Sequence, residues 1–289
     1  MRRGAARGKV ILLGEHAVVY NHPALAAAIS RQVTVSIEPA EATRLTLPGG
    51  LPTPHEVRDA AIVIARAAGF PGEFHAQVES EIPLGQGLGS SAALGVALAR
   101  ALHPGCSTEE AADLAMILET LLHGSPSGVD PAACAGDGII LFTRGEPPTI
   151  KTLRTPAPLW LVIAPTGLAR NTRNTVVPLS ERRKNEPARI DPLLARIGGL
   201  VQNAVDAIRD WKLPVLGAEM RENHAVLREL GVSCPELDEV VAALHHAGAL
   251  GAKLTGAGGG GSAIGLAEDE EHARRISEQV PGSFVEHVG

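Results

Sequence analysis

The segment from Pro83 to Ala93 constrains the fold of this chain more than any other feature, and it reads PLGQGLGSSAA. Its glycines alternate at positions 85, 87 and 89, which leaves bare backbone where a ligand could approach closely. Two serines follow, and residues 92–102 are an uninterrupted run of helix-forming residues. A glycine loop that leads into a helix presents unpaired N–H groups and the positive end of the helix dipole to an anion. The segment therefore predicts a phosphate-binding loop.

The alternative is a flexible turn before an ordinary surface helix, with Ser90 or Ser91 as a plain N-cap. The loop also departs from the two commonest phosphate-binding patterns. Ser90 interrupts the Gly-x-Gly-x-x-Gly pattern that starts at Gly85, and no lysine follows in the Walker position. Phosphate binding at this loop therefore requires a different architecture.

Composition limits the classes of partner that the chain can have. Its 289 residues are enough for two domains, and 45% of them are apolar. With four Phe, two Trp and one Tyr, the cores must be aliphatic, and no aromatic cluster is available for stacking nucleic-acid bases. The net charge of −6 argues against a general polyanion binder. We expect no nucleic-acid partner.

Cysteine usage and hydropathy indicate the compartment. Cys106, Cys134 and Cys234 are far apart and form no C-x-x-C pair, which argues against zinc or a disulfide framework and fits a reducing cytosol. The apolar run at 10–13 is too short for a signal peptide. No stretch approaches the roughly 20 apolar residues that a membrane span needs. We expect a cytoplasmic protein without a membrane partner.

Apolar periodicity predicts an α+β protein with two domains, residues 1–150 and 151–289, separated by the proline-rich stretch 144–158. In the first domain we expect strands at 10–13, 33–38, 74–81 and 138–142, and helices at 54–68, at 92–102 and after the capping box Ser107–Glu110. In the second we expect a strand at 159–164, helices at 191–211, 215–230 and 235–247, strands at 252–255 and 262–267, a helix at 269–279 and a strand at 283–288. This order in the second domain is typical of a split βαβ layout.

Four further features carry chemistry, and each has a structural alternative. Asp130 ends a loop shaped by glycine and proline, where it could simply cap the short turn that begins with Pro131. Glu119 lies on a helix, where most glutamates face solvent. Lys9 precedes the first apolar run and by itself reads as a surface lysine. Five glycines within 256–261 favour close packing of another backbone segment or a ligand.

Taken in order, these segments resemble the motifs of the GHMP small-molecule kinases. The resemblance extends from Gly8 to about Gly265 and is carried by residues 8–19, 83–93, 123–130 and 253–261. Within the family, the chain is most similar to members that phosphorylate mevalonate. The resemblance implies a two-domain α+β fold, with an N-terminal domain like ribosomal protein S5 domain 2 and a C-terminal ferredoxin-like split βαβ domain.

The resemblance also implies a reaction and a set of residue roles. Phosphate would pass from ATP, with Mg²⁺, to the 5-hydroxyl of mevalonate, a step of isoprenoid biosynthesis. Asp130 would face the attacking hydroxyl with Lys9 beside it, and Ser91 and Glu119 would hold Mg²⁺. The nucleotide would bind along the loop, at Pro83, Gly85, Gly87, Leu88, Gly89, Ser90, Ser91 and Ala92. The substrate would contact Glu15, His16, Arg170, Thr172 and Gly258. A homodimer is compatible with this resemblance.

Elementary chemistry agrees with these roles, because phosphoryl transfer asks a protein mainly for alignment and charge neutralisation. Mg²⁺ commonly takes one or two protein oxygens and completes its shell with phosphates and waters. Two alternatives stay open. One is a sister kinase that acts on phosphomevalonate, galactose or homoserine, and the other is a catalytically silent sensor, which would tolerate the loss of Lys9, Glu119 or Asp130. Position 94 is Leu, where some family members that phosphorylate mevalonate carry an aromatic residue, and this difference leaves adenine recognition open.

Overall fold

The computed structural model of the chain describes residues 1–124, 126–168 and 173–289, with side chains in the last range described from residue 179 onward. These residues form two compact units that interleave along the chain. The first unit comprises residues 1–9, 28–83 and 89–137, and the second comprises 10–27, 84–88 and 138–289. Compactness alone does not define an independently folding domain, so the expected boundary between residues 150 and 151 stays a prediction.

Two long strands contribute residues to both units. They are β1 (Arg2–Leu13) and β2 (Ala24–Pro39), which pair with each other. Both strands are longer than the apolar runs at 10–13 and 33–38 predicted. The added residues of β1 are small or polar, and those of β2 include a continuous buried run at 24–29, so neither stretch shows the alternation that predicts a strand locally. The turn between the strands contains a short 3₁₀ helix, η1 (Ala17–Tyr20).

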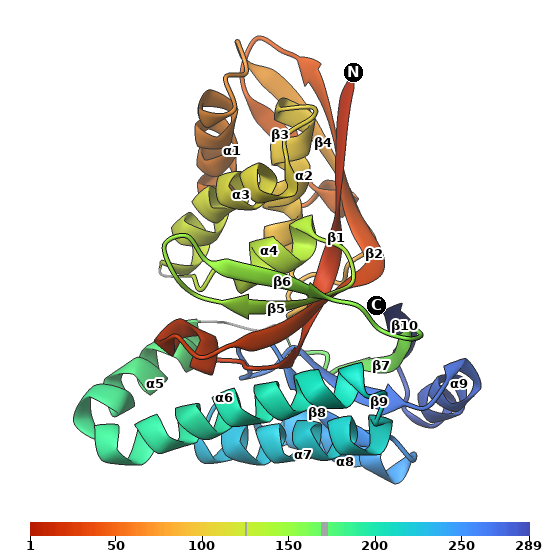
Figure 1. Ribbon diagram of the computed structural model, residues 1–289. Helices are drawn as coiled ribbons and strands as arrows, with labels where there is room; N and C mark the ends of the chain where they lie inside the picture. The colour runs from red at the N-terminus through yellow and green to blue at the C-terminus, as the bar shows by residue number, and fades with distance from the viewer. Residues whose placement is uncertain (125, 169–172) are drawn as a thin grey trace. The chain divides into compact units, whose positions relative to one another are not determined.

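In the first unit, a small sheet packs beside a group of helices (Figure 1). β4 (Phe74–Ser80) pairs antiparallel with the second half of β2 and parallel with β3 (Arg44–Thr46). Phe74, Ala76 and Val78 alternate on the buried face of β4, as a half-buried strand requires. A second 3₁₀ turn, η2 (Pro48–Gly50), precedes the helices, which are α1 (His55–Ala67), α2 (Ser90–Leu102), α3 (Thr108–His123) and α4 (Val129–Ala135).

Helices α2 and α3 pack closely because small residues meet between them. A Cβ atom added to Gly95 would lie 2.9 Å from the Cβ of Ala115, so only glycine fits at this crossing. The predicted capping box at the start of α3 is confirmed, since Ser107 accepts from the Glu110 amide and Glu110 accepts from the Ser107 amide. The same packing brings Glu119, in the last third of α3, beside Ser91 in the first turn of α2.

The second unit contains an antiparallel sheet in the order β10-β7-β9-β8. Its strands are β7 (Leu159–Pro165), β8 (Gly251–Thr255), β9 (Ser262–Ala267) and β10 (Phe284–Val288). Helices α8 (Pro235–His246) and α9 (Glu270–Gln279) pack on this sheet, α7 (Leu213–Glu229) packs on β8, and α6 (Pro187–Arg209) packs on α7 and α5 (Arg173–Asn185) (Figure 1). β7 lies between β9 and β10, which is the expected ferredoxin-like split βαβ arrangement.

The stretch 144–158, expected to be a linker, contains a strand. β6 (Thr149–Leu153) pairs antiparallel with β5 (Ile139–Thr143), and β5 pairs with the first residues of β2. Four of the five residues of β6 are exposed, so the strand has no apolar alternation that the sequence could display. Helix α5 and the three-residue β3 were likewise not predicted. Over the described part of the chain, no helix has the length and apolar character needed to cross a membrane.

Candidate active site

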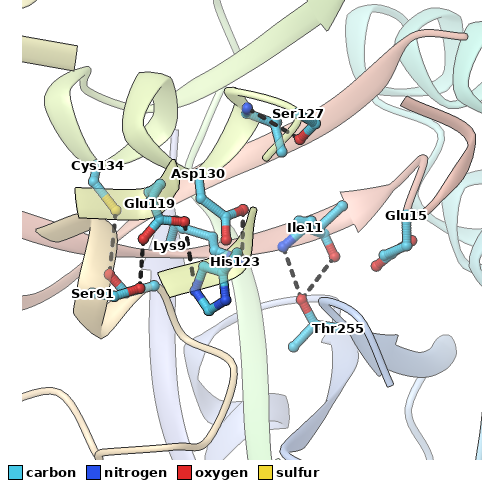
Figure 2. A network of polar contacts seen from close by, with 12 residues as sticks. Lys9, Ile11, Glu15, Ser91, Glu119, His123, Ser127, Asp130, Cys134 and Thr255 are labelled. Carbon is cyan, nitrogen blue, oxygen red and sulfur yellow. Dashed lines mark hydrogen bonds and ion pairs between the residues drawn. The ribbon is translucent and has the colours of Figure 1, made fainter. Parts of the chain in front are cut away.

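Lys9 and Asp130 form an ion pair inside the first unit. Lys9 Nζ lies 2.9 Å from Asp130 Oδ1, and the lysine side chain is fully buried while that of the aspartate is 23% exposed (Figure 2). Lys9 is therefore not a surface lysine. Asp130 does not cap the turn either, because α4 begins at Val129 after Gly128 and places Asp130 in its first turn. The carboxylate of Asp130 is therefore partly accessible to a ligand, and the buried Lys9 fixes its orientation from the other side.

Gly89 closes the space around Lys9. Its φ is +78°, and a Cβ atom at this position would lie 2.8 Å from Lys9 Cγ and 3.1 Å from Cys134 Sγ. Gly89 is also the N-cap residue of α2, so the last glycine of the predicted phosphate loop lies directly against the buried lysine. Burial raises the pKa of the Cys134 thiol well above its usual value, which keeps that neighbour uncharged.

Ser91 and Glu119 form a further polar contact in the first unit. Ser91 Oγ donates a 2.6 Å hydrogen bond to Glu119 Oε1 (Figure 2), and the glutamate is only 3% exposed. The alternative reading of Glu119 as a solvent-facing glutamate is therefore wrong. No described side chain caps α2, so the alternative role of Ser90 or Ser91 as a side-chain N-cap is also wrong. His123 Nε2 lies 3.8 Å from the other oxygen of Glu119.

The oxygen atoms of Ser91 and Glu119 fit a magnesium ion. Hard oxygen ligands suit Mg²⁺, which usually keeps several waters or phosphate oxygens and needs few groups from the protein. Within the described residues, no group of three or more His, Cys, Asp and Glu side chains is arranged to hold a metal. A site that relies on one hydroxyl and one carboxylate is thus compatible with a metal shared with a phosphate ligand, and less so with a metal enclosed by protein alone.

The predicted phosphate loop is divided between the two units. Leu84–Leu88 belong to the second unit, where Gly85 and Gly87 have φ values of +71° and +78° and Ser262 Oγ donates a 2.9 Å hydrogen bond to the carbonyl of Gln86. Pro83 and the residues from Gly89 onward belong to the first unit. Both serines and Ala92 lie in the first turn of α2, where main-chain N–H groups are available to an anion. Leu88 is buried.

The residues expected to contact the substrate lie in the second unit or outside the described residues. His16 is largely buried, and its Nε2 lies 2.9 Å from the carbonyl oxygen of Ala257. Glu15 is 1% exposed and pairs with Lys253. Arg170 and Thr172 fall outside the described residues. Their roles, and those of the other candidate residues, stay predictions.

The glycine run 256–261 packs against another backbone segment, as predicted. A Cβ atom on Gly258 would lie 2.0 Å from the carbonyl oxygen of Val232, and Gly259 donates a 2.9 Å hydrogen bond to the same oxygen. Gly261 donates to the carbonyl of Leu168. Gly258 is therefore required for packing at this position, whatever further contact it makes with a ligand.

Sequence reasoning missed several polar groups that support these loops. Lys253 on β8 and Asn223 on α7 both contact Glu15, and both are fully buried. His224, next in α7, lies with Nδ1 3.4 Å from the amide nitrogen of Leu254. Burial, with a smaller effect of the Lys253 charge, lowers the pKa of His224 to about 4. A lysine in an otherwise apolar strand was a visible signal, since such a residue is either exposed or paired.

Two family profiles and several near full-length relatives match this chain. Residues 55–138 match the profile described as GHMP kinases N terminal domain, and residues 204–286 match GHMP kinases C terminal. The chain is 34% identical to mevalonate kinase of Thermococcus sibiricus over 97% of its own length and 93% of the relative. It is 35% identical to mevalonate kinase of Aeropyrum pernix, again over 97% of its length and 93% of the relative.

A solved structure with a bound ligand is also similar. The crystal structure of L. major mevalonate kinase in complex with R-mevalonate matches with a TM-score of 0.85 and 27% identity, over 100% of this chain and 96% of that chain. The two profiles and the near full-length relatives agree with the resemblance carried by the motifs. The chain therefore belongs to the GHMP kinase family.

Proposed function

We propose that this GHMP kinase transfers the γ-phosphoryl group of ATP to the 5-hydroxyl of mevalonate. The contact between Lys9 and Asp130 is the observation that carries the phosphoryl-transfer part of the proposal. A carboxylate that is partly exposed and held by a buried cation is suited to receive a hydroxyl group. The mevalonate part is supported by relatives with that name that match nearly the whole chain.

In the proposed mechanism, Asp130 accepts a hydrogen bond from the substrate hydroxyl and orients its oxygen for attack on the γ-phosphorus. The proton of that hydroxyl passes to the carboxylate as the new P–O bond forms and ADP leaves. Lys9 holds Asp130 in place and places positive charge beside the phosphoryl oxygens. Its ammonium group is removed from bulk water, so its field is weakly screened, and such fixed charges contribute strongly to catalysis.

The metal and the nucleotide phosphates have a matching set of residues. Mg²⁺, when bound to Ser91 and Glu119, supplies charge neutralisation between the phosphates. The amides at the start of α2 bind the phosphate oxygens, assisted by the helix dipole. For the acceptor substrate, we assign His16 as a polar contact, because it follows β1 and its Nε2 lies 2.9 Å from the carbonyl oxygen of Ala257 in the glycine run.

A substrate panel tests the proposal. ADP release by the purified protein is measured with ATP, Mg²⁺ and each of mevalonate, phosphomevalonate, galactose and homoserine. We expect mevalonate to give by far the highest kcat/KM. Equal or faster turnover of another alcohol would assign the protein to a sister kinase, and nucleotide binding without turnover of any of them would favour the sensor alternative.

A further inference from the structure

The second unit contains a buried ion pair that the proposed mechanism does not use. Glu15 is 1% exposed and Lys253 is fully buried, and Lys253 Nζ contacts Glu15 Oε1. Asn223 Nδ2 donates a 3.1 Å hydrogen bond to the other oxygen of the same carboxylate. Both oxygens of Glu15 therefore have protein partners, a lysine from β8 and an amide from α7.

Burial of these charges needs an explanation other than stability. Removing an ion from water costs several kcal/mol, and a buried pair often contributes no more than well-packed apolar side chains of similar size. Lys253 also donates to two carbonyl groups, those of Ile11 at 3.5 Å and of Leu254 at 2.5 Å. The lysine thus links the end of β1 and the following loop to β8.

The loop that follows β1 is held in a strained conformation. His16 has φ +61° and ψ −44°, a backbone conformation that residues other than glycine rarely adopt. Such strain persists only where surrounding contacts enforce it. Glu15 immediately precedes His16, so fixing the Glu15 side chain fixes the peptide that leads into the strained residue. Ala257, just beyond β8, meets the imidazole ring of His16.

A second set of contacts joins the end of β1 to the face of β8 that carries Lys253. Thr255 lies two residues after Lys253 and therefore on the same side of the strand. Its Oγ1 accepts a 2.8 Å hydrogen bond from the Ile11 amide and donates at 3.1 Å to the Ile11 carbonyl, as Figure 2 shows. Lys253 and Thr255 thus both donate to the Ile11 carbonyl, and Lys253 also contacts Glu15 at the other end of the segment 11–15.

We infer that Glu15, Lys253 and Asn223 form a clamp that fixes the loop 14–22 and holds His16 in its strained conformation before the substrate binds. In this arrangement Lys253 and Asn223 are positioning residues. Glu15 also acts through the clamp instead of contacting the substrate, since its side chain is 1% exposed and both of its oxygens face protein donors. The effect on the acceptor substrate rests on the proposed function, whereas the effect on the loop does not.

Amide hydrogen exchange of the ligand-free protein tests the clamp directly. Val18, Val19 and His22 donate main-chain hydrogen bonds within the loop, so their exchange rates report its order. We expect K253M and E15Q each to accelerate exchange at these amides about tenfold or more, a change that corresponds to about 1.4 kcal/mol of local opening. Lys212→Met is the matched control, because Lys212 forms an exposed pair with Asp210. Unchanged exchange in folded K253M would overturn the inference.

Steady-state kinetics separate the clamp from direct substrate contact. If the clamp operates, K253M and E15Q lower kcat/KM for the acceptor by similar factors, about tenfold, and the double variant is no worse than either one, because both remove the same interaction. The KM for ATP stays within about threefold of the wild-type value. A direct contact of Glu15 with the substrate predicts instead that E15Q is impaired while K253M is normal. That result would also overturn the inference.

Loss of one partner leaves a lone buried charge, so a single variant could fail to fold. The double variant E15Q/K253M leaves no unpaired charge and keeps the side-chain volumes nearly unchanged, and N223A removes only the neutral partner. Faster exchange at the three loop amides is expected in both, and unchanged exchange in both would contradict the clamp. If the wild-type protein prefers a different acceptor, the proposed function fails, and the same kinetic comparison is made with that acceptor while the exchange measurement is unaffected.

Discussion

The ammonium nitrogen of Lys9 lies 2.9 Å from the carboxylate of Asp130, although the two residues come from opposite ends of the first unit's sequence. Lys9 is in β1 and Asp130 is in the first turn of α4. The lysine is fully buried and the aspartate is partly exposed, so the pair has one side in the core and one side available to a ligand. This asymmetry is compatible with the proposed role of Asp130 as proton acceptor for a substrate hydroxyl.

Replacing Asp130 with Asn should lower kcat by about 10²–10⁴, the range typical of a positioned acid or base, because the amide cannot accept the proton. Nucleotide affinity should change little. Single-turnover assays and ATP binding by calorimetry measure the two quantities. Asp137→Asn is the control, since Asp137 forms an exposed pair with Arg7 in the same unit. A nearly fully active D130N protein would remove Asp130 from the mechanism.

Replacing Gly89 with Ala should displace Lys9, because the new Cβ would lie 2.8 Å from Lys9 Cγ in addition to the strain of a positive φ. We expect a loss of about 1–3 kcal/mol in the free energy of unfolding and a clear loss of activity. Chemical denaturation and kcat are measured. Gly105→Ala is a close control, since Gly105 has φ +87° but has no atom near its Cβ position. Equal effects of the two substitutions would show that backbone strain, and not the contact with Lys9, is responsible.

Replacing Glu119 with Gln should raise the Mg²⁺ concentration required for half-maximal activity by about tenfold, because one charged ligand is lost while the shape is kept. Binding of Mn²⁺ in the presence of nucleotide, followed by electron paramagnetic resonance, gives a readout independent of turnover. Glu109→Gln on the exposed side of the same helix is the control. An unchanged metal requirement in E119Q would assign Glu119 a structural role.

The stability of the protein should fall in mild acid because of His224. Its pKa of about 4 lies below the usual 6.5, so the unfolded chain binds a proton more readily than the folded chain between these values. The stabilisation is therefore present above about pH 6.5 and is lost as the pH falls toward 4, with a magnitude of about 3 kcal/mol.

Urea denaturation at pH 7.5 and pH 5 measures this dependence. In His224→Asn, the side-chain oxygen can accept from the Leu254 amide without titrating, so the difference in stability between the two pH values should shrink relative to the wild-type protein. His55→Gln, at an exposed histidine, should leave the difference unchanged. An identical pH dependence in H224N and wild type would contradict this assignment.

Local patterns in the sequence predicted the elements whose capping or burial pattern can be read within the element itself. The capping box of α3, the amphipathic face of α1 and the alternation of β4 are all contained within a few turns or residues. β6 was missed because its exposed residues carry no periodic signal, and its conformation comes from pairing with β5. The extended parts of β1 and β2 depend in the same way on partners that are distant in sequence.

The candidate site was predictable to the extent that its motifs occur in a recognisable order. That order anticipated the Lys9–Asp130 contact and the pairing of Ser91 with Glu119. The burial of Glu119 had a local signal, because Ala112 and Ala115 precede it on the same helical face and both are buried. The partners of Glu15 had none, since they depend on which faces of β8 and α7 meet the end of β1.

The position of Cys134 makes it a native probe of the first unit. Its thiol is buried against Gly89 and has a raised pKa, and alkylating reagents attack the exposed thiolate. Cys106 and Cys234 are more accessible, so they should label first and can be replaced by serine. In a variant with both of these cysteines replaced by serine, the slow labelling rate of Cys134 would measure how often α2 and α4 separate under assay conditions, without any attached fluorophore.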